Sequence, residues 1–263
     1  MRTLLAIARI ETRECLRSKS IYVICVLMLS FILLNRGCTM GNSPVTSTIL
    51  SQHARQNLPV SIAFHIISFW SMVLCGLIAS SVLPKELEEK KLIMVLSRPV
   101  KRSVFLAGKM FAVFFLSSLS FSLFISIFFV FRYLDGGYIN PKIIPASFIF
   151  QLNIILMAIG GFFSSLLLPR MLAPLAGLFV YMISFGIEIP FYFNRLRLIW
   201  EPSASLQTVH RLFPRVGEVQ FLCGSLIHSH PAMKEFIVPV GNVMLYSLIL
   251  WLLVVFIFNR KQI

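Results

Sequence analysis

The sequence predicts an all-α integral membrane protein with six transmembrane helices. Three observations predict this fold class. Hydrophobic residues make up 57% of the 263-residue chain and charged residues only 13%, and the mean hydropathy of +0.85 is far above that of a soluble domain. The apolar residues also gather in separate segments, most of which reach the roughly 20 residues that a helix needs to cross a bilayer. We therefore expect residues 1–263 to form a single transmembrane domain.

Residues 1–19 predict an amphipathic helix that lies on the inner membrane surface. Apolar residues recur there at helical spacing, whereas Arg9, Arg13 and Arg17 follow one another at four-residue intervals along another face. Two roles stay open for this interfacial helix. It is either an anchor that acts through its positive charge or a surface that contacts another protein.

Six apolar segments are expected to cross the membrane. They lie at residues 20–37, 60–83, 103–133, 143–168, 172–192 and 236–258. The first has the shortest apolar core, but we expect a retained span, because the segment before it is too long for a signal peptide and carries acidic residues. Only Pro169-Arg170-Met171 joins the fourth and fifth spans, which predicts a tight antiparallel hairpin.

Small and polar residues inside the spans have two interpretations. The third span carries Ser118, Ser122 and Ser126 at four-residue intervals, and the fourth carries paired glycines and serines at residues 160–165. Such rows favour close helix packing, while a substrate path along the serines is the alternative. Glu188, near the outer end of the fifth span, is a functional candidate because a carboxylate within the membrane is costly. Alternatively, it reaches interfacial water.

Residues 193–235 form the one sizeable extracytoplasmic loop, and their spacing predicts two short amphipathic helices on the outer membrane face. The loop is a lid, a docking surface for an extracytoplasmic partner, or the entry point for a lipid-like substrate. Cys223, His228 and His230 offer metal ligands, but three ligands on one loop do not make a closed site, so no metal site is predicted. A disulfide between Cys38 and Cys223 stays open.

The distribution of basic residues predicts the topology. With the N-terminus inside, 15 of the 24 Lys and Arg residues lie in cytoplasmic segments, as the positive-inside rule requires. Both termini are therefore expected in the cytoplasm, with the chain in the cell membrane, most simply a bacterial inner membrane. The net charge of +14 is explained by orientation and by membrane lipids rather than by a nucleic acid partner, since no soluble fold presents a basic cluster.

The cytoplasmic loop at residues 85–102 has the most distinctive sequence in the chain. Its order is KELEEKKLIMVLSRPVKR, with charged residues first, then apolar residues, then Ser97-Arg98-Pro99. This order predicts a short amphipathic helix that ends at the proline. The pattern resembles the loop between the second and third spans of ABC-2 type permeases, although Lys90-Lys91 stands where a Gly-Thr or Lys-Thr pair is usual. The Ser-Arg-Pro-Val core is most similar to permeases of the nitrous-oxide-reductase maturation type.

The resemblance implies that this loop is a coupling helix that docks into an ATP-binding subunit, and that the interfacial helix packs against the same subunit. The coupling residues that it implies are Glu86, Glu88, Glu89, Leu92, Leu96, Ser97, Arg98 and Pro99. It also implies a permease subunit of an ABC exporter, assembled with two copies of the ATPase and a second permease subunit, either identical or closely related.

The chain itself lacks the means to bind ATP. Gly108-Lys109-Met110 has neither the upstream glycine nor the hydroxyl residue of a phosphate-binding loop. No enzymatic activity and no cofactor are expected in this chain, and the partner ATPase would bind ATP and magnesium. Two alternatives stay open, an intramembrane enzyme acting on lipid or peptide and a non-enzymatic membrane scaffold. The enzyme would need polar residues that converge within the spans, whereas Glu188, His65, Gln151 and Asn153 are scattered along the sequence.

Overall fold

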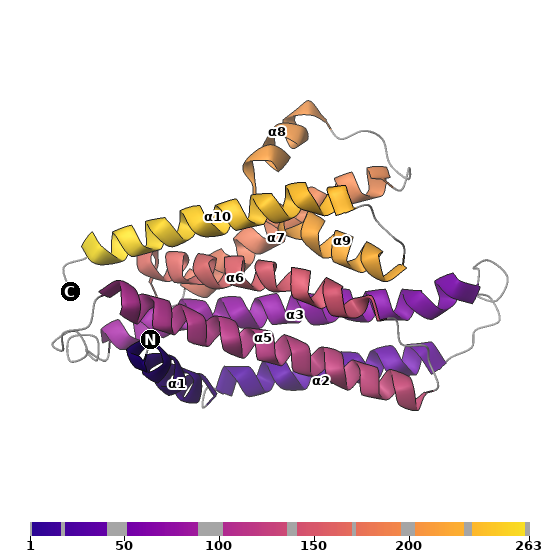
Figure 1. Ribbon diagram of the computed structural model, residues 1–263, viewed down its shortest axis with the longest axis horizontal. Coiled ribbons are helices and arrows are strands. Elements are labelled where there is room, and N and C mark those ends of the chain that lie inside the picture. The colour runs from indigo at the N-terminus through magenta and orange to yellow at the C-terminus, as the bar shows by residue number, and fades with distance from the viewer. Residues whose placement is uncertain are drawn as a thin grey trace.

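The computed structural model describes residues 2–16, 19–40, 52–88, 102–135, 141–169, 172–195, 203–228 and 233–260. Every element that it describes there is a helix, which confirms the predicted all-α class. The helices are α1 Arg2–Leu16, α2 Lys19–Met40, α3 Gln52–Glu88, α5 Arg102–Leu134, α6 Ile143–Leu167, α7 Leu172–Arg195, α8 Ala204–Leu212, α9 Val216–His228 and α10 Met233–Arg260. The long helices run side by side in one elongated bundle (Figure 1).

Five of the described helices contain stretches long and apolar enough to cross a membrane. These stretches are Val60–Pro84, Arg102–Leu134, Ile143–Leu167, Leu172–Phe191 and Lys234–Arg260. They match the second to sixth predicted spans to within three residues at each end. In α2 the apolar stretch is shorter, Cys25–Leu34, so the first predicted span stays a prediction.

Helix α3 forms the centre of the bundle, where it packs most extensively against α6 and also contacts α2, α5, α7 and α9. The ring of Phe64 on α3 packs edge-on against Phe121 of α5 and Phe150 of α6, with ring centroids 6.1 and 5.9 Å apart. The last two rings are 4.9 Å apart. These three buried phenylalanines join α3, α5 and α6 into one core.

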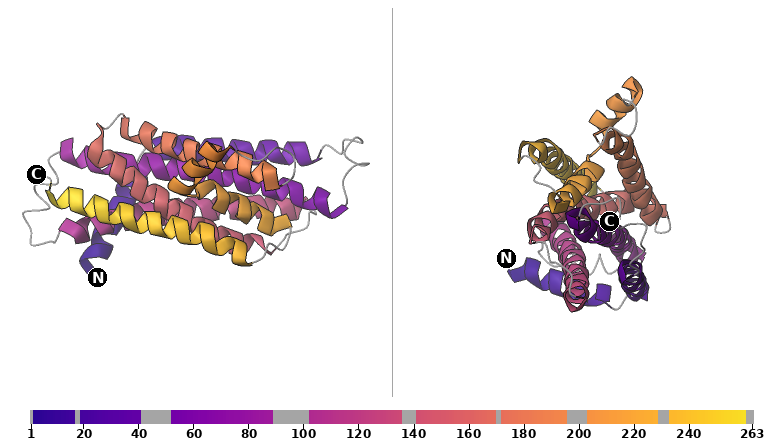
Figure 2. Two further views of the ribbon diagram at one scale, coloured as in Figure 1. Left: turned by 90° about the horizontal axis from the view of Figure 1, so that it is seen from above. Right: turned by 90° about the vertical axis from the view of Figure 1, so that its right-hand side faces the viewer.

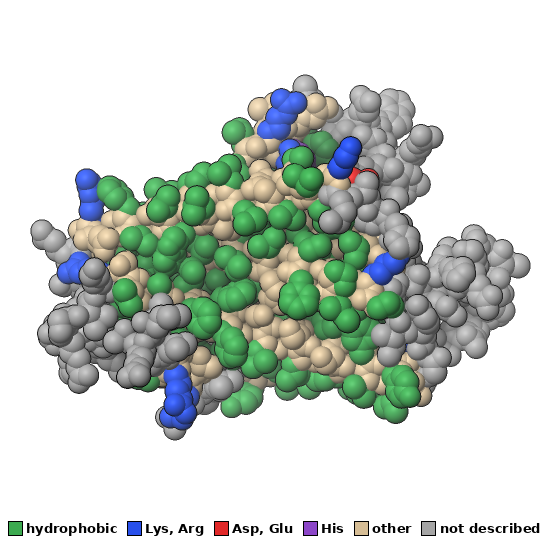
Figure 3. All heavy atoms as spheres, viewed as in Figure 1, with side chains coloured by type: hydrophobic (Ala, Val, Ile, Leu, Met, Phe, Trp, Pro, Cys, Tyr) green, Lys and Arg blue, Asp and Glu red, His purple; other side chains and the backbone are tan. Residues whose placement is uncertain are grey.

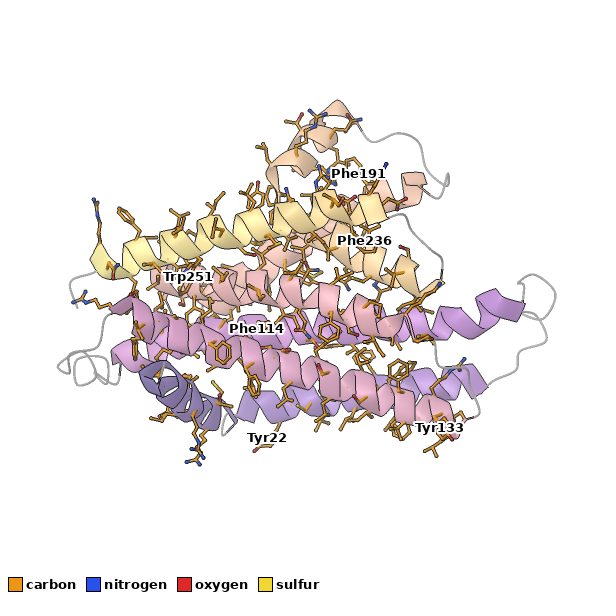
Figure 4. All side chains as sticks on the ribbon, in the orientation of Figure 1. Tyr22, Phe114, Tyr133, Phe191, Phe236 and Trp251 are labelled. Carbon is orange, nitrogen blue, oxygen red and sulfur yellow. The ribbon has the colours of Figure 1, made fainter. Side chains whose placement is uncertain are left out.

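Apolar side chains cover much of the outer surface of the bundle, as the membrane requires. Figure 3 shows them across the middle of one face, with lysines and arginines mainly at the two ends and on α8. Helix α10 is the least covered span, since only 11% of its most apolar window is buried. Tyr133, on the last turn of α5, is 70% exposed and points away from the bundle (Figure 4).

Both chain termini lie at the same end of the bundle, which we call the terminal end (Figure 1). The last turn of α3 and the first turn of α5 lie there too. Helix α1 contacts α5 and lies across the direction of the long helices, as the end-on view shows (Figure 2). The segment predicted as an interfacial helix is therefore helical over residues 2–16, as α1, and it is held against the bundle. Its place on the inner membrane surface stays a prediction.

The two short helices predicted in residues 193–235 are present as α8 and α9, but the position of the second corrects the prediction. Helix α8 projects from the bundle (Figure 2). Helix α9 lies inside it, in contact with α3, α6, α7 and α10, and residues such as Val219 and Cys223 are fully buried. The physical reason is its composition, because the stretch Val216–Ile227 is apolar and lacks a broad polar face that water could solvate.

Close packing of α6 on α3 depends on Gly161. A β-carbon placed on Gly161 would lie 2.5 Å from the Ala79 β-carbon and 3.3 Å from the backbone nitrogen of Ser80. The neighbouring Gly160 has nothing within 4 Å of the same position. The small-residue row in the fourth predicted span therefore serves packing at Gly161, as expected for helices that associate in lipid.

We predict that Gly161→Ala destabilises the protein, because the added methyl group must push α6 away from the backbone of α3. Overpacking of this kind costs about 1–3 kcal/mol. The matched control is Gly160→Ala, whose free energy of unfolding should lie within about 0.5 kcal/mol of the wild-type value. The melting temperatures of both variants are measured in detergent, with size-exclusion chromatography as the readout of unfolding. Equal melting temperatures for the two variants would contradict the close α3–α6 contact.

Candidate functional site

Residues 203–228, which we call the re-entrant hairpin, comprise α8, a turn at Phe213-Pro214-Arg215 and α9. Helix α9 packs inside the bundle, whereas α8 contacts mainly α7 and projects outward (Figure 2). The three turn residues are half-buried. The carbonyl oxygen of Val216, just after this turn, accepts a hydrogen bond from the Asn153 side chain of α6 at 3.0 Å. Asn153 lies about 15 Å along α6 from its N-terminal end by helical rise. The turn therefore reaches about half the depth of a bilayer's hydrocarbon core.

Side chains from neighbouring helices satisfy the backbone of this turn. Ser184 of α7 donates a hydrogen bond to the Pro214 carbonyl oxygen, and Tyr246 of α10 donates to that of Leu212. The backbone N–H of Arg215 donates to Asn242 Oδ1 of α10 at 3.0 Å. Non-helical backbone is tolerated at membrane depth only where protein groups or water replace the lost helical hydrogen bonds. The turn meets that condition through α7 and α10, and α6 adds the Asn153 bond to the start of α9.

Further polar and close contacts fix α9 against its neighbours. Gln220 accepts a hydrogen bond from the Tyr181 hydroxyl at 3.0 Å and donates one to the His65 carbonyl oxygen at 3.4 Å. Glycines let α9 approach closely, because a β-carbon on Gly217 would lie 2.7 Å from Glu188 Cγ. One on Gly224 would lie 2.4 Å from His65 Nε2. Helix α9 is thus a built part of the bundle.

A polar cluster surrounds the N-terminal end of α9. Glu188 of α7 lies 3.0 Å from His210 Nε2 of α8, and Glu218 of α9 lies 3.3 Å from Arg215 Nη1. The Glu188, His210 and Glu218 side chains are 5, 12 and 8% exposed. Their nearest ligand-type atoms all lie within 4.8 Å of one another. The re-entrant hairpin therefore brings together three ionisable groups from three helices.

An apolar cavity of about 380 Å³ lies between α6, α7 and α10. It is lined by Met72, Leu156, Met157, Gly160, Phe163, Ser164, Leu167, Leu168, Ala176, Gly177, Val180, Tyr181, Ser184, Pro214, Val216 and Leu250. The α6 and α7 residues belong to the halves of those helices nearer the terminal end, and Pro214 and Val216 close the cavity on the other side. Its volume falls in the range typical of small-molecule sites.

At the terminal end, a buried ion pair joins α1 to α5. Lys109 Nζ lies 2.6 Å from Glu11 Oε2, and the two side chains are 1 and 9% exposed. The ammonium also lies 5.0 Å from the centroid of the Phe105 ring, within the range of a cation–π interaction. Because an unpaired charge is costly in such surroundings, this pair fixes where α1 sits on α5.

The structure places the predicted site residues as follows. Arg9 and Arg13 are exposed on α1, while Arg17 lies outside the described residues. Glu86 and Glu88 belong to the last turn of α3, so the start of the predicted coupling helix continues the second span. The remaining predicted coupling residues, Glu89, Leu92, Leu96, Ser97, Arg98 and Pro99, lie outside the described residues, and their role stays a prediction.

The candidate path residues divide into two groups. Glu188 is buried and belongs to the polar cluster described above. Ser118 is half-buried on α5, and Ser122 and Ser126 are exposed on its outer surface, where the Ser126 hydroxyl donates to the Ser122 carbonyl oxygen. None of the three serines lines the apolar cavity. A path along them stays a prediction, and the cavity provides a separate candidate.

Most of the residues that build the two sites were not predicted from the sequence. Lys109 was considered as part of Gly108-Lys109-Met110, and Glu11 was not connected with any partner. His210, Arg215 and Glu218 were placed on the outer membrane face. Polar residues within otherwise apolar spans are the sequence feature that could have indicated the hairpin. They are Asn153, Ser184 and Asn242, and each forms a hydrogen bond with the backbone of residues 214–216. Cys223 is a free, buried thiol, and the Cys38 side chain lies outside the described ones.

The long apolar helices define a multi-pass membrane protein. The chain matches the family model described as ABC-2 family transporter protein over residues 5–259, and it belongs to that family. Comparison with curated proteins finds no match. The chain is thus a permease subunit of an ABC transporter, and its family implies an ABC ATPase subunit as partner.

We predict that Asn153→Leu destabilises the protein by about 0.5–1.5 kcal/mol, because α6 then loses its hydrogen bond to the Val216 carbonyl oxygen at the start of α9. The matched control is Gln151→Leu in the same helix. Gln151 Oε1 is buried with no hydrogen-bond partner among the described residues, so this change should be neutral or stabilising. Thermal melting in detergent distinguishes the two, and a larger loss for Gln151→Leu would contradict the proposed support of the turn.

A second prediction concerns the ion pair between α1 and α5. Lys109→Met leaves Glu11 buried without its cation and should cost about 3–5 kcal/mol, whereas replacing both partners with methionine should recover most of that loss. Melting temperatures of the single and double variants in detergent test this. A double variant no more stable than Lys109→Met would show that the two side chains do not act as a pair.

Proposed function

We propose that this permease exports its substrate, driven by ATP hydrolysis in a separate ATPase subunit that docks at the terminal end of the bundle. In this proposal the terminal end faces the cytoplasm, and two ATPase copies and a second permease subunit complete the transporter. The ATP and magnesium are bound by the ATPase. The substrate enters the apolar cavity from the cytoplasmic half of the membrane and leaves past the re-entrant hairpin.

The position of the cavity is the observation that carries the direction of transport. It lies on the terminal side of the α8–α9 turn, with Pro214 and Val216 between it and the opposite end. A cavity closed on the outer side and lined by α6, α7 and α10 suits loading from the cytoplasmic half. Its lining is almost wholly apolar, which favours a substrate, or part of one, that partitions into the membrane.

The arrangement of the terminal end supports the proposed ATPase contact. The Glu11–Lys109 pair fixes α1 to α5 a few turns after the predicted coupling residues, and α3 carries Glu86 and Glu88 into the same end. An ATPase that contacts α1 and the loop after Glu88 would therefore act on α3 and α5 together. Contacts that differ between two states are what bias a bundle toward one of them.

The weak burial of α10 is consistent with a second permease subunit in the membrane. Its exposed apolar residues include Met244, Leu248 and Leu252, which are 56–60% exposed. They follow one another at four-residue intervals and so share one face of the helix. Lipid or a second copy would cover this face, and the dimer in the proposal places the second copy in the same membrane plane.

The experiment that tests the proposal is a mild-detergent pull-down of the tagged chain, followed by mass spectrometry and an ATPase assay. We expect an ATPase with a phosphate-binding loop, whose activity rises when the permease is present. Glu88→Lys combined with Glu89→Lys should abolish that stimulation without preventing membrane insertion, because it reverses charge at the predicted contact.

The control for charge is Glu235→Lys, since Glu235 lies in the first turn of α10 at the opposite end. This variant should retain full ATPase stimulation. Unchanged stimulation in the Glu88/Glu89 variant would remove the loop from the coupling role. A chain that is recovered without any ATPase in several detergents would overturn the whole proposal and favour the enzyme or scaffold alternative.

A further inference from the structure

The polar cluster at the re-entrant hairpin has the composition of a metal site. It consists of one imidazole and two carboxylates, from His210 on α8, Glu188 on α7 and Glu218 on α9. All three side chains are nearly buried, unlike the acidic groups that gather on solvated surfaces. We propose that Glu188, His210 and Glu218 bind a divalent transition metal ion, with Zn²⁺ as the best fit.

The spacing of the ligand atoms supports this site. In a tetrahedral zinc site with ligand bonds of about 2.0–2.2 Å, neighbouring ligand atoms are roughly 3.3 Å apart. His210 Nε2 and Glu188 Oε2 are already 3.0 Å apart, and the ligand-type atoms of all three residues lie within 4.8 Å of one another. A small rotation of the Glu218 side chain completes the three protein ligands. The fourth position is then left for water, as in zinc sites with three protein ligands.

The surroundings hold two of the ligands in position. The His210 ring stacks on Phe191 of α7 with centroids 4.1 Å apart, and Figure 4 labels Phe191 beneath α8. Arg215 Nη1 donates a hydrogen bond to Glu218 Oε2 at 3.3 Å. Metal-binding carboxylates are commonly hydrogen-bonded in this way by neighbouring groups that orient them. The backbone of Gly217 packs against Glu188, which brings α9 close to α7 at this point.

Two separate ion pairs, Glu188 with His210 and Glu218 with Arg215, account for the individual contacts. They do not require the Glu218 carboxylate to lie within 4.8 Å of the ligand-type atoms of the other two residues. A metal ion bound by all three side chains would join α7, α8 and α9. It would lie beside the turn that closes the cavity, on the side away from the terminal end. Metal occupancy would then stabilise the closed arrangement of the re-entrant hairpin, because the ion binds only where the three ligands converge.

The test uses the full chain, purified in detergent through a tag without histidines and freed of metal with a chelator. Zn²⁺ is titrated in competition with a fluorescent chelator, and Co²⁺ is used as a spectroscopic probe of tetrahedral coordination. We expect one equivalent of Zn²⁺ per chain, tetrahedral Co²⁺ absorption, and a higher melting temperature with Zn²⁺ bound.

Three variants locate the ion, Glu188→Gln, His210→Ala and Glu218→Gln. Each should weaken Zn²⁺ binding by at least about tenfold, since even partners of metal ligands commonly contribute that much. Glu218→Gln keeps the shape of the side chain and a hydrogen bond to Arg215, so it tests the ligand without disturbing the fold. The control Glu235→Gln, an exposed acid on α10, should bind Zn²⁺ like the wild type.

Two results would overturn the proposal. One is the absence of stoichiometric Zn²⁺ binding to a chain that melts cooperatively, which would leave Glu188 and His210 as an ion pair. The other is Zn²⁺ binding that all three variants retain, which would place the ion elsewhere, for instance at His228 and His230. Both results are independent of the ATPase assay, so the metal site and the transport proposal can fail separately.

Discussion

The structure depends on one constraint, that backbone hydrogen-bonding groups cannot be left unsatisfied inside an apolar bundle. The re-entrant turn at Phe213-Pro214-Arg215 interrupts the helical ladder at membrane depth, and side chains replace the missing bonds. Ser184, Asn242 and Tyr246 supply them from α7 and α10, and Asn153 of α6 bonds the first carbonyl of α9. This requirement explains why α6, α7 and α10 carry polar side chains at the same depth. It also fixes those three helices around a single point, because each loses a partner if the turn moves.

The two clusters of buried charge have different roles. At the terminal end, Glu11 and Lys109 form a single buried pair that positions α1 on α5. A pair of this kind is weak evidence for stability, since two apolar residues could do as well, but it specifies one arrangement of the helices. Beside the re-entrant turn, about midway along the bundle, Glu188, His210 and Glu218 converge from three helices. Under the proposed mechanism, the first arrangement receives the push of the ATPase and the second holds the hairpin that must yield to it.

Composition and helical periodicity predicted the features that depend on local sequence. The second to sixth spans match the structure closely, and the first predicted segment is helical as α1, with Arg9 and Arg13 exposed. The re-entrant hairpin was not predicted, because the apolar stretch Val216–Ile227 is too short to read as a span and follows a proline. Nor could the sequence bring Glu188, His210 and Glu218 together. Their proximity depends on the direction in which α8 and α9 fold back, which no local pattern encodes.

The depth of the hairpin also accounts for the cavity. Helix α9 contacts α6, α7 and α10 in the half of the bundle away from the termini, where it occupies the space between them. Helix α9 begins at Val216. On the terminal side of that residue, α6, α7 and α10 are too stiff to bend abruptly toward one another. The space between α6, α7 and α10 therefore continues toward the terminal end without a helix to fill it. Pro214 and Val216 close this space on the side nearer α9. A hairpin that crossed the whole membrane would leave no such cavity, and one that lay on the outer face would leave it open at both ends.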